Sequence, residues 1–257
     1  MELRPSTELT RAELAQLFTA AYEGYFVPFQ VDQARLAQMV DVFDLDLGRS
    51  LVAYDGDTPV GLANLGLRGE RTWLGGVGVV TSHRRRGIGE KLTRALLDQA
   101  RAAGAREMVL EVIAENAPAI ALYEKLGFRT TRMLEVLTLP AAEGEQAHEA
   151  DLAETRARVT AERAEPEPWQ REDGTLDNLT GLAAVSAGVA HAVYRVDGQR
   201  VDLLQAGGDP AGLLPALCAR GSVLALNFPE DGPVATALRE AGATLVLTQR
   251  EMVVALR

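Results

Sequence analysis

The chain has 257 residues, of which 47% are hydrophobic and 24% are charged, and its formal net charge is −10. This length allows one large domain or two small ones, and either arrangement can bury a proper core. The acidic balance argues against a nucleic-acid-binding protein, because the neutralisation of phosphates requires a broadly basic surface. It fits a cationic or amine substrate instead.

Cysteine usage and the distribution of apolar residues narrow the class of protein further. Cys218 is the only cysteine, so we expect neither an intrachain disulfide nor a cysteine metal cluster, and we predict no metal site. Residues 1–10 are polar and charged where a signal peptide needs an apolar core. The apolar runs are shorter than the roughly 20 residues of a membrane span. The sequence therefore predicts a cytoplasmic protein with no membrane partner.

The order of the predicted elements indicates the fold class. Apolar residues at helical spacing predict two helices within the first 45 residues. Further along, periodicity and turn residues predict strands at 50–54, 59–67, 73–80 and 107–113, a helix from Ile88 that stops at Gly104, a helix at 116–126 and a strand pair at 128–139. Gly75, Gly76 and Gly78 indicate a bulge in the third strand or a close approach of another group. This mixture predicts an α/β (α+β) fold, a mixed, mostly antiparallel sheet flanked by helices.

A change of composition predicts the domain boundaries. Residues 141–168 are rich in alanine, glutamate and arginine and end with two closely spaced prolines. This composition is typical of a linker or of a solvated connecting helix. We therefore expect a first domain at 1–140 and a second at 169–257.

The second domain repeats part of the first. The stretch from Glu115 to Gly127 matches the stretch from Glu230 to Gly242 without a gap. Upstream, residues 190–205 are typical of another hairpin, with its turn at 197–198. Proline and glycine recur at helix ends by chance, but the gapless spacing favours a tandem repeat. The second half is then a partial second copy of the first.

One loop has the composition of a phosphate site. The string Arg84-Arg85-Arg86-Gly87-Ile88-Gly89 lies between a predicted strand and an amphipathic helix. Small residues there let the backbone approach a ligand, and the N–H groups and dipole of a helix start attract a phosphate. Glycine-containing helix starts are common, and the arginines can equally be solvated side chains. The string alone is therefore a weak signal.

Two motifs in order resemble the GNAT superfamily of N-acetyltransferases, and the resemblance spans roughly residues 3–139. The first motif consists of Val77-Gly78-Val79 followed by Arg84-Arg85-Arg86-Gly87-Ile88-Gly89. The second consists of Glu111-Val112-Ile113-Ala114-Glu115-Asn116 and Ala121-Leu122-Tyr123-Glu124-Lys125-Leu126-Gly127-Phe128. Their pairing at the expected separation is specific. Thr81 departs from the pattern, since the family more often has a proline before the loop.

The resemblance implies that acetyl-CoA is the co-substrate and assigns roles to residues. The backbone of Val77, Gly78 and Val79 would pair with the pantetheine arm like an added strand. The loop formed by Arg84, Arg85, Arg86, Gly87, Ile88, Gly89 and Glu90 would hold the pyrophosphate through backbone N–H groups. Asn116 would contact the cofactor near the thioester, and Tyr123 would donate a proton to the departing thiolate. Glu111 stands where some relatives place a general base.

Each of these roles has a simpler structural alternative. Asn116 is a helix-cap candidate, and Tyr123 has the periodicity of a core residue. Glu111 also fits a half-exposed strand. His83 is a base candidate or a surface residue. The aromatic residues Tyr22, Tyr25, Phe26 and Phe29 are expected either to line the acceptor pocket or to pack.

The second half lacks the residues that carry these roles. It has Gly207-Gly208-Asp209-Pro210 where the first has the arginine loop, and Leu238 where the first has Tyr123. We therefore expect the second half to be a catalytically silent copy. It would pack on the first domain as an intramolecular pseudo-dimer in a monomeric protein. The alternative is that the protein forms a homodimer. The predicted function is acetyl transfer to a primary amine of a small molecule, with a protein or peptide N-terminus as the other acceptor class. A non-catalytic acyl-CoA-binding sensor is the alternative.

Overall fold

The computed structural model describes residues 1–144 and 147–256 and divides the chain into two compact units. The first comprises Met1–Val112, Asn116–Thr130 and Met252–Arg257, and the second comprises Ile113–Glu115 and Thr131–Glu251. This division differs from the boundaries expected at 140 and 168. The described part of the segment 141–168 folds with the second unit, while its residues 145–146, like Arg257, lie outside the described residues.

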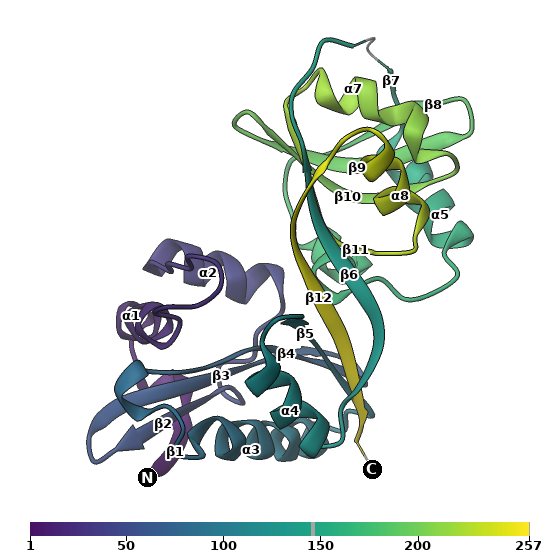
Figure 1. The fold of residues 1–257 in the computed structure, drawn as a ribbon. Helices are drawn as coiled ribbons and strands as arrows, with labels where there is room; N and C mark the ends of the chain where they lie inside the picture. The colour runs from purple at the N-terminus through teal and green to yellow at the C-terminus, as the bar shows by residue number, and fades with distance from the viewer. Residues whose placement is uncertain (145–146, 257) are drawn as a thin grey trace. The chain divides into compact units, whose positions relative to one another are not determined.

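The first unit is a sheet with helices on both faces (Figure 1). Its strands are β1 (Glu2–Pro5), β2 (Leu51–Asp55), β3 (Thr58–Arg68), β4 (Arg71–Val79) and β5 (Glu107–Ile113). Its helices are α1 (Arg11–Ala21), α2 (Gln33–Val42), α3 (Ile88–Ala102) and α4 (Ala117–Lys125), with short 3₁₀ turns η1 (Ser6–Glu8) and η2 (Thr81–His83). Helices α1 and α2 cover one face of the sheet, and α3 and α4 cover the other.

The sequence determines the ends of these helices through caps. Thr10 and Glu13 form a capping box at the start of α1, and the Asp32 side chain accepts the Arg35 N–H at the start of α2. Gly104, which follows α3, has φ +82°, a conformation that glycine adopts without steric cost. These local signals explain why the helices lie where periodicity predicts them.

The strands of the first unit run in chain order. Neighbours from β1 to β4 pair antiparallel, whereas β4 and β5 pair in parallel because α3 connects them. The core between the sheet and helices α3 and α4 contains Leu92, Leu96 and Met108, each fully buried. Met252, Val254 and Leu256 from the far end of the sequence belong to this same core. The Leu256 N–H donates to the Arg106 carbonyl at 2.7 Å, beside the start of β5.

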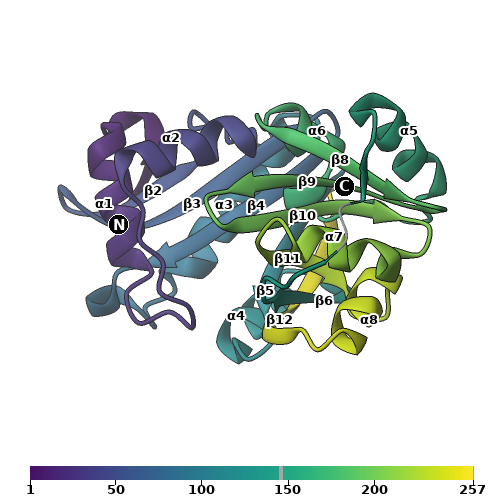
Figure 2. The same ribbon diagram turned by 90° about the horizontal axis from the view of Figure 1, so that it is seen from above.

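The second unit repeats this plan. Its strands are β7 (His148–Glu149), β8 (Leu182–Ala187), β9 (Ala190–Asp197), β10 (Arg200–Gly207), β11 (Ser222–Pro229) and the greater parts of β6 (Arg129–Leu139) and β12 (Thr244–Ala255). Its helices are α5 (Leu152–Glu162), α6 (Asp173–Asp177), α7 (Leu214–Cys218) and α8 (Pro233–Glu240), with 3₁₀ turns η3 (Trp169–Arg171) and η4 (Pro210–Leu213). Strands β8, β9 and β10 lie side by side (Figure 2).

Strand order confirms the partial second copy. The order β7-β8-β9-β10-β11 is antiparallel up to β10, and β10 then pairs with β11 in parallel, as β4 does with β5. Helix α8 follows β11 as α4 follows β5, and both helices end before a glycine of positive φ, Gly127 at +93° and Gly242 at +86°. The spacing shared by the two halves therefore corresponds to a shared succession of elements.

One predicted element is wrong. The expected strand pair at 128–139 is a single strand, β6, from Arg129 to Leu139. Its neighbours in the sheet are β12 and β11, and in the pairing with β11 Leu139 lies opposite Val223. A pattern of alternating residues indicates a strand but not whether its partner is the next segment or one far away in the sequence. In the described ranges, helices long and apolar enough to cross a membrane are absent.

Candidate active site

Strands β4 and β5 separate in the middle of the first unit. Their parallel pairing covers Arg71–Trp73 and Glu107–Val109. Farther along β4, residues Val77–Val79 pair with Gly61–Ala63 of β3. Among the described strands, no strand pairs with the other edge of Val77–Val79. A bulge causes this separation, because two residues of β4, Gly75 and Gly76, stand opposite one residue of β3. The other backbone edge of Val77–Val79 is therefore available to an extended ligand.

The loop that follows β4 leads into α3 through glycines. Gly87 is the N-terminal cap of α3 with φ +77°, and no side chain caps the helix there. Ile88 is buried and anchors the first turn in the core. At Gly89 a Cβ atom would meet only Leu122 and Val77, at 3.8 and 4.0 Å. The first N–H groups of a helix lack intrahelical partners, so this 15-residue helix presents a site that suits a phosphate.

The three arginines of this loop differ in their contacts. The Arg84 guanidinium donates to three carbonyl oxygens, those of Val79 at 2.9 Å, Ala21 at 3.1 Å and Glu23 at 2.7 Å. Arg85 and Arg86 are exposed, and Arg85 has φ +62°. The expected cofactor role of Arg84 therefore concerns its backbone, because its side chain is engaged with the protein.

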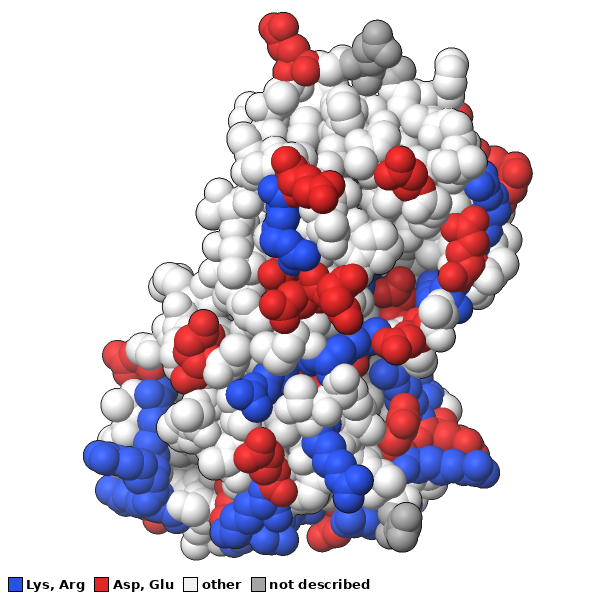
Figure 3. Space-filling view, turned by 45° about the vertical axis from the view of Figure 1, so that its right-hand side comes forward, with Lys and Arg blue, Asp and Glu red and all other residues white. Residues whose placement is uncertain are grey.

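Glu90, in the first turn of α3, is held by two cations. Its carboxylate accepts from Lys125 at 2.7 Å and from Arg94 at 2.9 Å. The hydrogen bond from Lys125, and secondarily that from Arg94, lowers the pKa of Glu90. Figure 3 shows that basic and acidic side chains also lie next to each other on the face of the molecule that it draws.

Tyr123 is a buried phenol on α4. It is 7% exposed and its ring meets Phe128 edge-on, with the centroids 5.6 Å apart. Burial raises the pKa of Tyr123 far above its ordinary value, and Tyr25 raises it further. The phenol therefore keeps its proton at neutral pH. A group in this state can donate a proton or a hydrogen bond but cannot act as a base.

Asn116 caps α4 and lies beside the segment between α1 and α2. Its Oδ1 accepts the Ala119 N–H at 3.3 Å, which confirms the capping alternative. Its side chain also lies near the Tyr25 phenol. Burial raises the pKa of Tyr25, and the neighbouring Asn116 side chain acts in the opposite direction. The start of α4 is thus linked to the segment between α1 and α2.

That segment brings aromatic side chains over β4. Tyr22 stacks on Phe18 with a centroid distance of 5.0 Å and meets Tyr25 edge-on at 5.1 Å. Burial, followed by the charge of Tyr123 and then of Tyr25, raises the pKa of Tyr22. A pocket of about 750 Å³ lies beside these rings, and its lining includes Gln16, Thr19, Tyr22, Glu23, Tyr25 and Phe29. Glu23 is the charged residue of this lining.

Glu111 lies where β5 leaves β4. Its Oε2 accepts from the Trp73 indole N–H at 2.8 Å. Leu110 and Val112 point into the core beneath α3 and α4. Alternation along β5 therefore places Glu111 on the opposite face, the face that α1 and α2 cover. His83 lies elsewhere, with Nε2 at 3.3 Å from Asp55.

Sequence reasoning missed the contacts that join these parts. The bonds from Arg84 to Ala21 and Glu23 and the bond between Trp73 and Glu111 connect residues 38 to 63 positions apart. Local periodicity carries no signal for them. The one available hint was the glycine at position 78, because a glycine in a strand often marks the close approach of another group.

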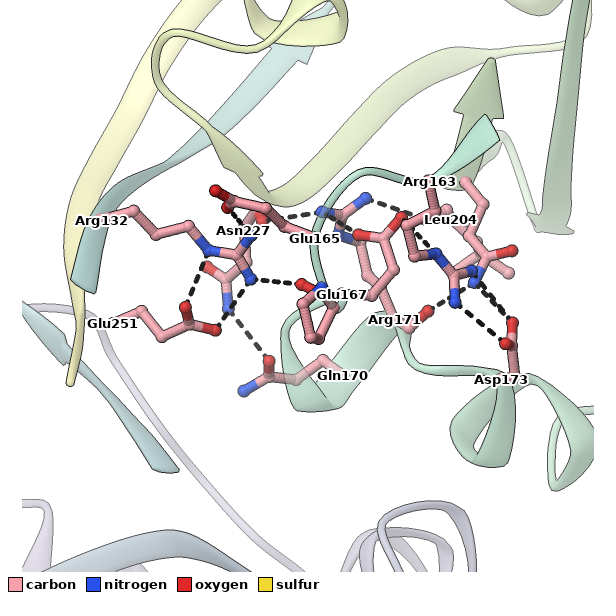
Figure 4. Close-up of polar contacts among 12 residues, drawn as sticks. Arg132, Arg163, Glu165, Glu167, Gln170, Arg171, Asp173, Leu204, Asn227 and Glu251 are labelled. Carbon is pink, nitrogen blue, oxygen red and sulfur yellow. Dashed lines mark hydrogen bonds and ion pairs between the residues drawn. The ribbon is translucent and has the colours of Figure 1, made fainter. Parts of the chain in front are cut away.

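In the second unit a buried arginine occupies the equivalent position between strands. Strands β10 and β11 pair over Arg200–Leu203 and Ser222–Ala225. Just beyond that pairing, the Arg171 guanidinium donates to the carbonyls of Leu204 at 3.2 Å and Asn227 at 3.1 Å (Figure 4). Arg171 is 1% exposed, and burial lowers its pKa to about 10, so it stays charged at neutral pH. It also pairs with Glu167 at 2.7 Å.

The comparisons with known proteins agree with the site. Residues 12–128 match the family described as the acetyltransferase (GNAT) family. This stretch contains the bulge in β4, the glycine loop, Glu111, Asn116 and Tyr123. The part of the chain that carries the candidate site therefore matches the GNAT acetyltransferase family.

Individual relatives are similar over shorter stretches or in fold alone. The mycothiol acetyltransferase of Corynebacterium glutamicum is 52% identical over 52 residues, which are 20% of this chain and 18% of the relative. N-alpha-acetyltransferase 30 of Schizosaccharomyces pombe is 41% identical over 58 residues, 23% of this chain and 39% of the relative. This chain therefore covers well under half the length of either protein.

A solved structure has the same fold over the whole chain. The GCN5-related N-acetyltransferase from Sphaerobacter thermophilus superposes with a TM-score of 0.72 at 14% identity. The match covers 100% of this chain and 96% of that one. At this level of identity the likeness shows the fold, including a counterpart for the second unit.

Proposed function

We propose that the protein transfers an acetyl group from acetyl-CoA to a primary amine. The observation that carries this proposal is the separation of β4 and β5 next to the glycine loop. It leaves a free backbone edge at Val77–Val79 beside a helix start suited to phosphate. An extended chain with a pyrophosphate at one end has the matching chemistry, and the open contact at Gly89 leaves room for its approach.

The residues around this gap suit acyl transfer. When bound, acetyl-CoA supplies an activated thioester that an amine attacks directly. Backbone N–H groups of the bulged strand stabilise the charge that develops on the carbonyl oxygen. Tyr123, a phenol that is protonated at neutral pH, gives its proton to the departing thiolate. Glu111, on the face opposite α3 and α4, receives the proton that the attacking amine loses.

The acceptor is proposed to enter on the face of the sheet that α1 and α2 cover. The aromatic rings of Tyr22, Tyr25 and Phe29 and the carboxylate of Glu23 beside the pocket suit an amine with an apolar body. The partial similarities to a mycothiol acetyltransferase and to an N-alpha-acetyltransferase leave two acceptor classes, small-molecule amines and peptide N-termini.

A coenzyme A release assay tests the proposal. Purified protein and acetyl-CoA are incubated with a panel of small primary amines and with peptides that have a free N-terminus. The expected result is amine-dependent thiol release together with a product that is heavier by one acetyl group. Binding of acetyl-CoA without turnover on the whole panel would favour the non-catalytic sensor. Absence of binding in calorimetry would refute both functions.

A further inference from the structure

Arg84 joins the glycine loop to the end of α1. One guanidinium nitrogen, Nη2, donates to the carbonyls of both Ala21 and Glu23, and Nε donates to Val79 at the end of β4. The last carbonyls of a helix have no intrahelical partner, and a cation at that end is favourable. Arg84 therefore satisfies the end of α1 from a distance of 61 to 63 residues in the sequence.

A second contact strengthens this junction. The Thr81 hydroxyl lies 3.4 Å from Oε2 of Glu23, so the turn before the loop also reaches the segment after α1. The packing at Gly78 is equally close, because a Cβ atom there would lie 2.8 Å from Cβ of Ala21. The residues 21–23 are thus fixed to β4 and to the loop by side chain, hydroxyl and packing contacts.

The segment held in this way carries the side chains of the acceptor side. Tyr22 follows Ala21 directly and lies over Gly76 and Gly78, and Tyr25 reaches Asn116 at the start of α4. A single residue, Gly24, separates Glu23 from Tyr25. The loop is therefore joined to Tyr22 and Tyr25 through a very short length of chain.

On the basis of the proposed function, we infer that Arg84 is a positioning residue that couples occupation of the glycine loop to the acceptor-side segment 19–31. Its guanidinium does not bind the cofactor phosphates. Binding of coenzyme A orders the loop, and Arg84 transmits this order to the segment that carries Tyr22 and Tyr25. Because coupling between two ligands is reciprocal, an acceptor that orders the segment also tightens cofactor binding.

Hydrogen exchange of the full-length protein with and without saturating coenzyme A tests this inference. In the unaltered protein, coenzyme A should slow exchange at both the start of α3 and residues 19–31. In Arg84→Gln, coenzyme A affinity by calorimetry should stay within about threefold and protection of α3 should persist, since the backbone site is intact. Protection of residues 19–31 should be lost. Arg101→Gln, an exposed arginine later in α3 that pairs with Asp98, should behave like the unaltered protein.

A kinetic measurement separates positioning from a general structural role. With any amine that supports turnover, Arg84→Gln should raise KM for the amine about tenfold, in the range of a lost charged hydrogen bond, with little change in KM for acetyl-CoA. Added guanidinium should partly restore the amine KM of Arg84→Ala.

A larger loss of coenzyme A affinity than of amine affinity would identify Arg84 as a phosphate ligand and overturn the inference. Two results of hydrogen exchange would also overturn the inference. One is full protection of residues 19–31 in Arg84→Gln, and the other is no protection of these residues in the unaltered protein although it binds coenzyme A. If the unaltered protein binds no coenzyme A, the proposed function itself fails, and calorimetry shows this before any variant is compared.

Discussion

The ring of Tyr22 lies against Gly78 of β4 so closely that a Cβ atom on Gly78 would be 2.9 Å from Cε2 of the ring. Gly78→Ala should therefore displace Tyr22 or β4 and reduce the free energy of unfolding by about 1–3 kcal/mol, the usual cost of overpacking. Urea unfolding measures this loss. Gly89→Ala is the matched control, because its Cβ would make only ordinary contacts at 3.8 Å or more. Equal stability of the two variants would contradict the packing described.

Tyr123→Phe removes the phenol hydroxyl but keeps the ring. We expect unchanged coenzyme A affinity and a turnover lower by roughly 10²–10⁴-fold, the range for the loss of a general acid. The edge-on contact with Phe128 should survive, so the unfolding midpoint serves as the control for folding. Full turnover in a correctly folded variant would mean that water or another group protonates the thiolate.

Glu111→Gln tests the assignment of the base. A base acts in its deprotonated form, so activity that depends on it rises as the pH increases. The variant should lose this rising limb from its pH-rate profile while acetyl-CoA binding stays the same. The amide can still accept from the Trp73 indole, which preserves the contact at 2.8 Å in the unaltered protein. An identical profile in both proteins would transfer the role to water or to the acceptor itself.

The buried tyrosines predict loss of stability in alkali. Burial raises the pKa of Tyr22 and Tyr123 above the ordinary value of 10.0. Above that value the unfolded chain has lost protons that the folded chain retains, so the free energy of unfolding falls with rising pH. The slope is about 1.4 kcal/mol per pH unit for each tyrosine.

Urea unfolding at several pH values between about pH 8 and pH 11 measures this slope, because this range includes the ordinary tyrosine pKa of about 10. In the Tyr123→Phe variant, the fall of the free energy of unfolding with pH should be less steep by the contribution of one tyrosine. A stability that does not change across this range would mean that these phenols ionise as readily in the folded protein as in the unfolded chain.

Removal of the residues after Glu251 should unfold or strongly destabilise the first unit. Met252, Val254 and Leu256 are at most 9% exposed and belong to its core. Losing three such side chains costs on the order of 5 kcal/mol, comparable to the whole stability of many domains. Val253→Thr in the full chain is the control. It changes a residue of the same strand whose side chain points away from this core, so it should have a much smaller effect on stability. Unaltered thermal unfolding of the shortened chain would contradict the assignment of these residues to the first core.

Patterns in the sequence predicted what depends on neighbouring residues. The hairpin of β2 and β3, the helix ends at Gly104 and Gly127, and the repeated spacing up to Gly242 follow from local turn and cap chemistry. The partners of β6 did not follow, because β11 and β12 lie more than 80 positions away in the sequence. The same limit explains why the guanidiniums of Arg84 and Arg171, each bonded to carbonyls of distant segments, had no signature.

The membership of Met252, Val254 and Leu256 in the first core has a consequence for how the protein is made. A ribosome releases the amino-terminal strands and helices first, and domains usually fold as they emerge. Here the earlier unit lacks part of its interior until translation has passed residue 252, after all of the second unit has been synthesised. Until then, the apolar surface beside β5 remains exposed in the nascent chain, and the order of synthesis is therefore the reverse of the order in which the two units can be completed.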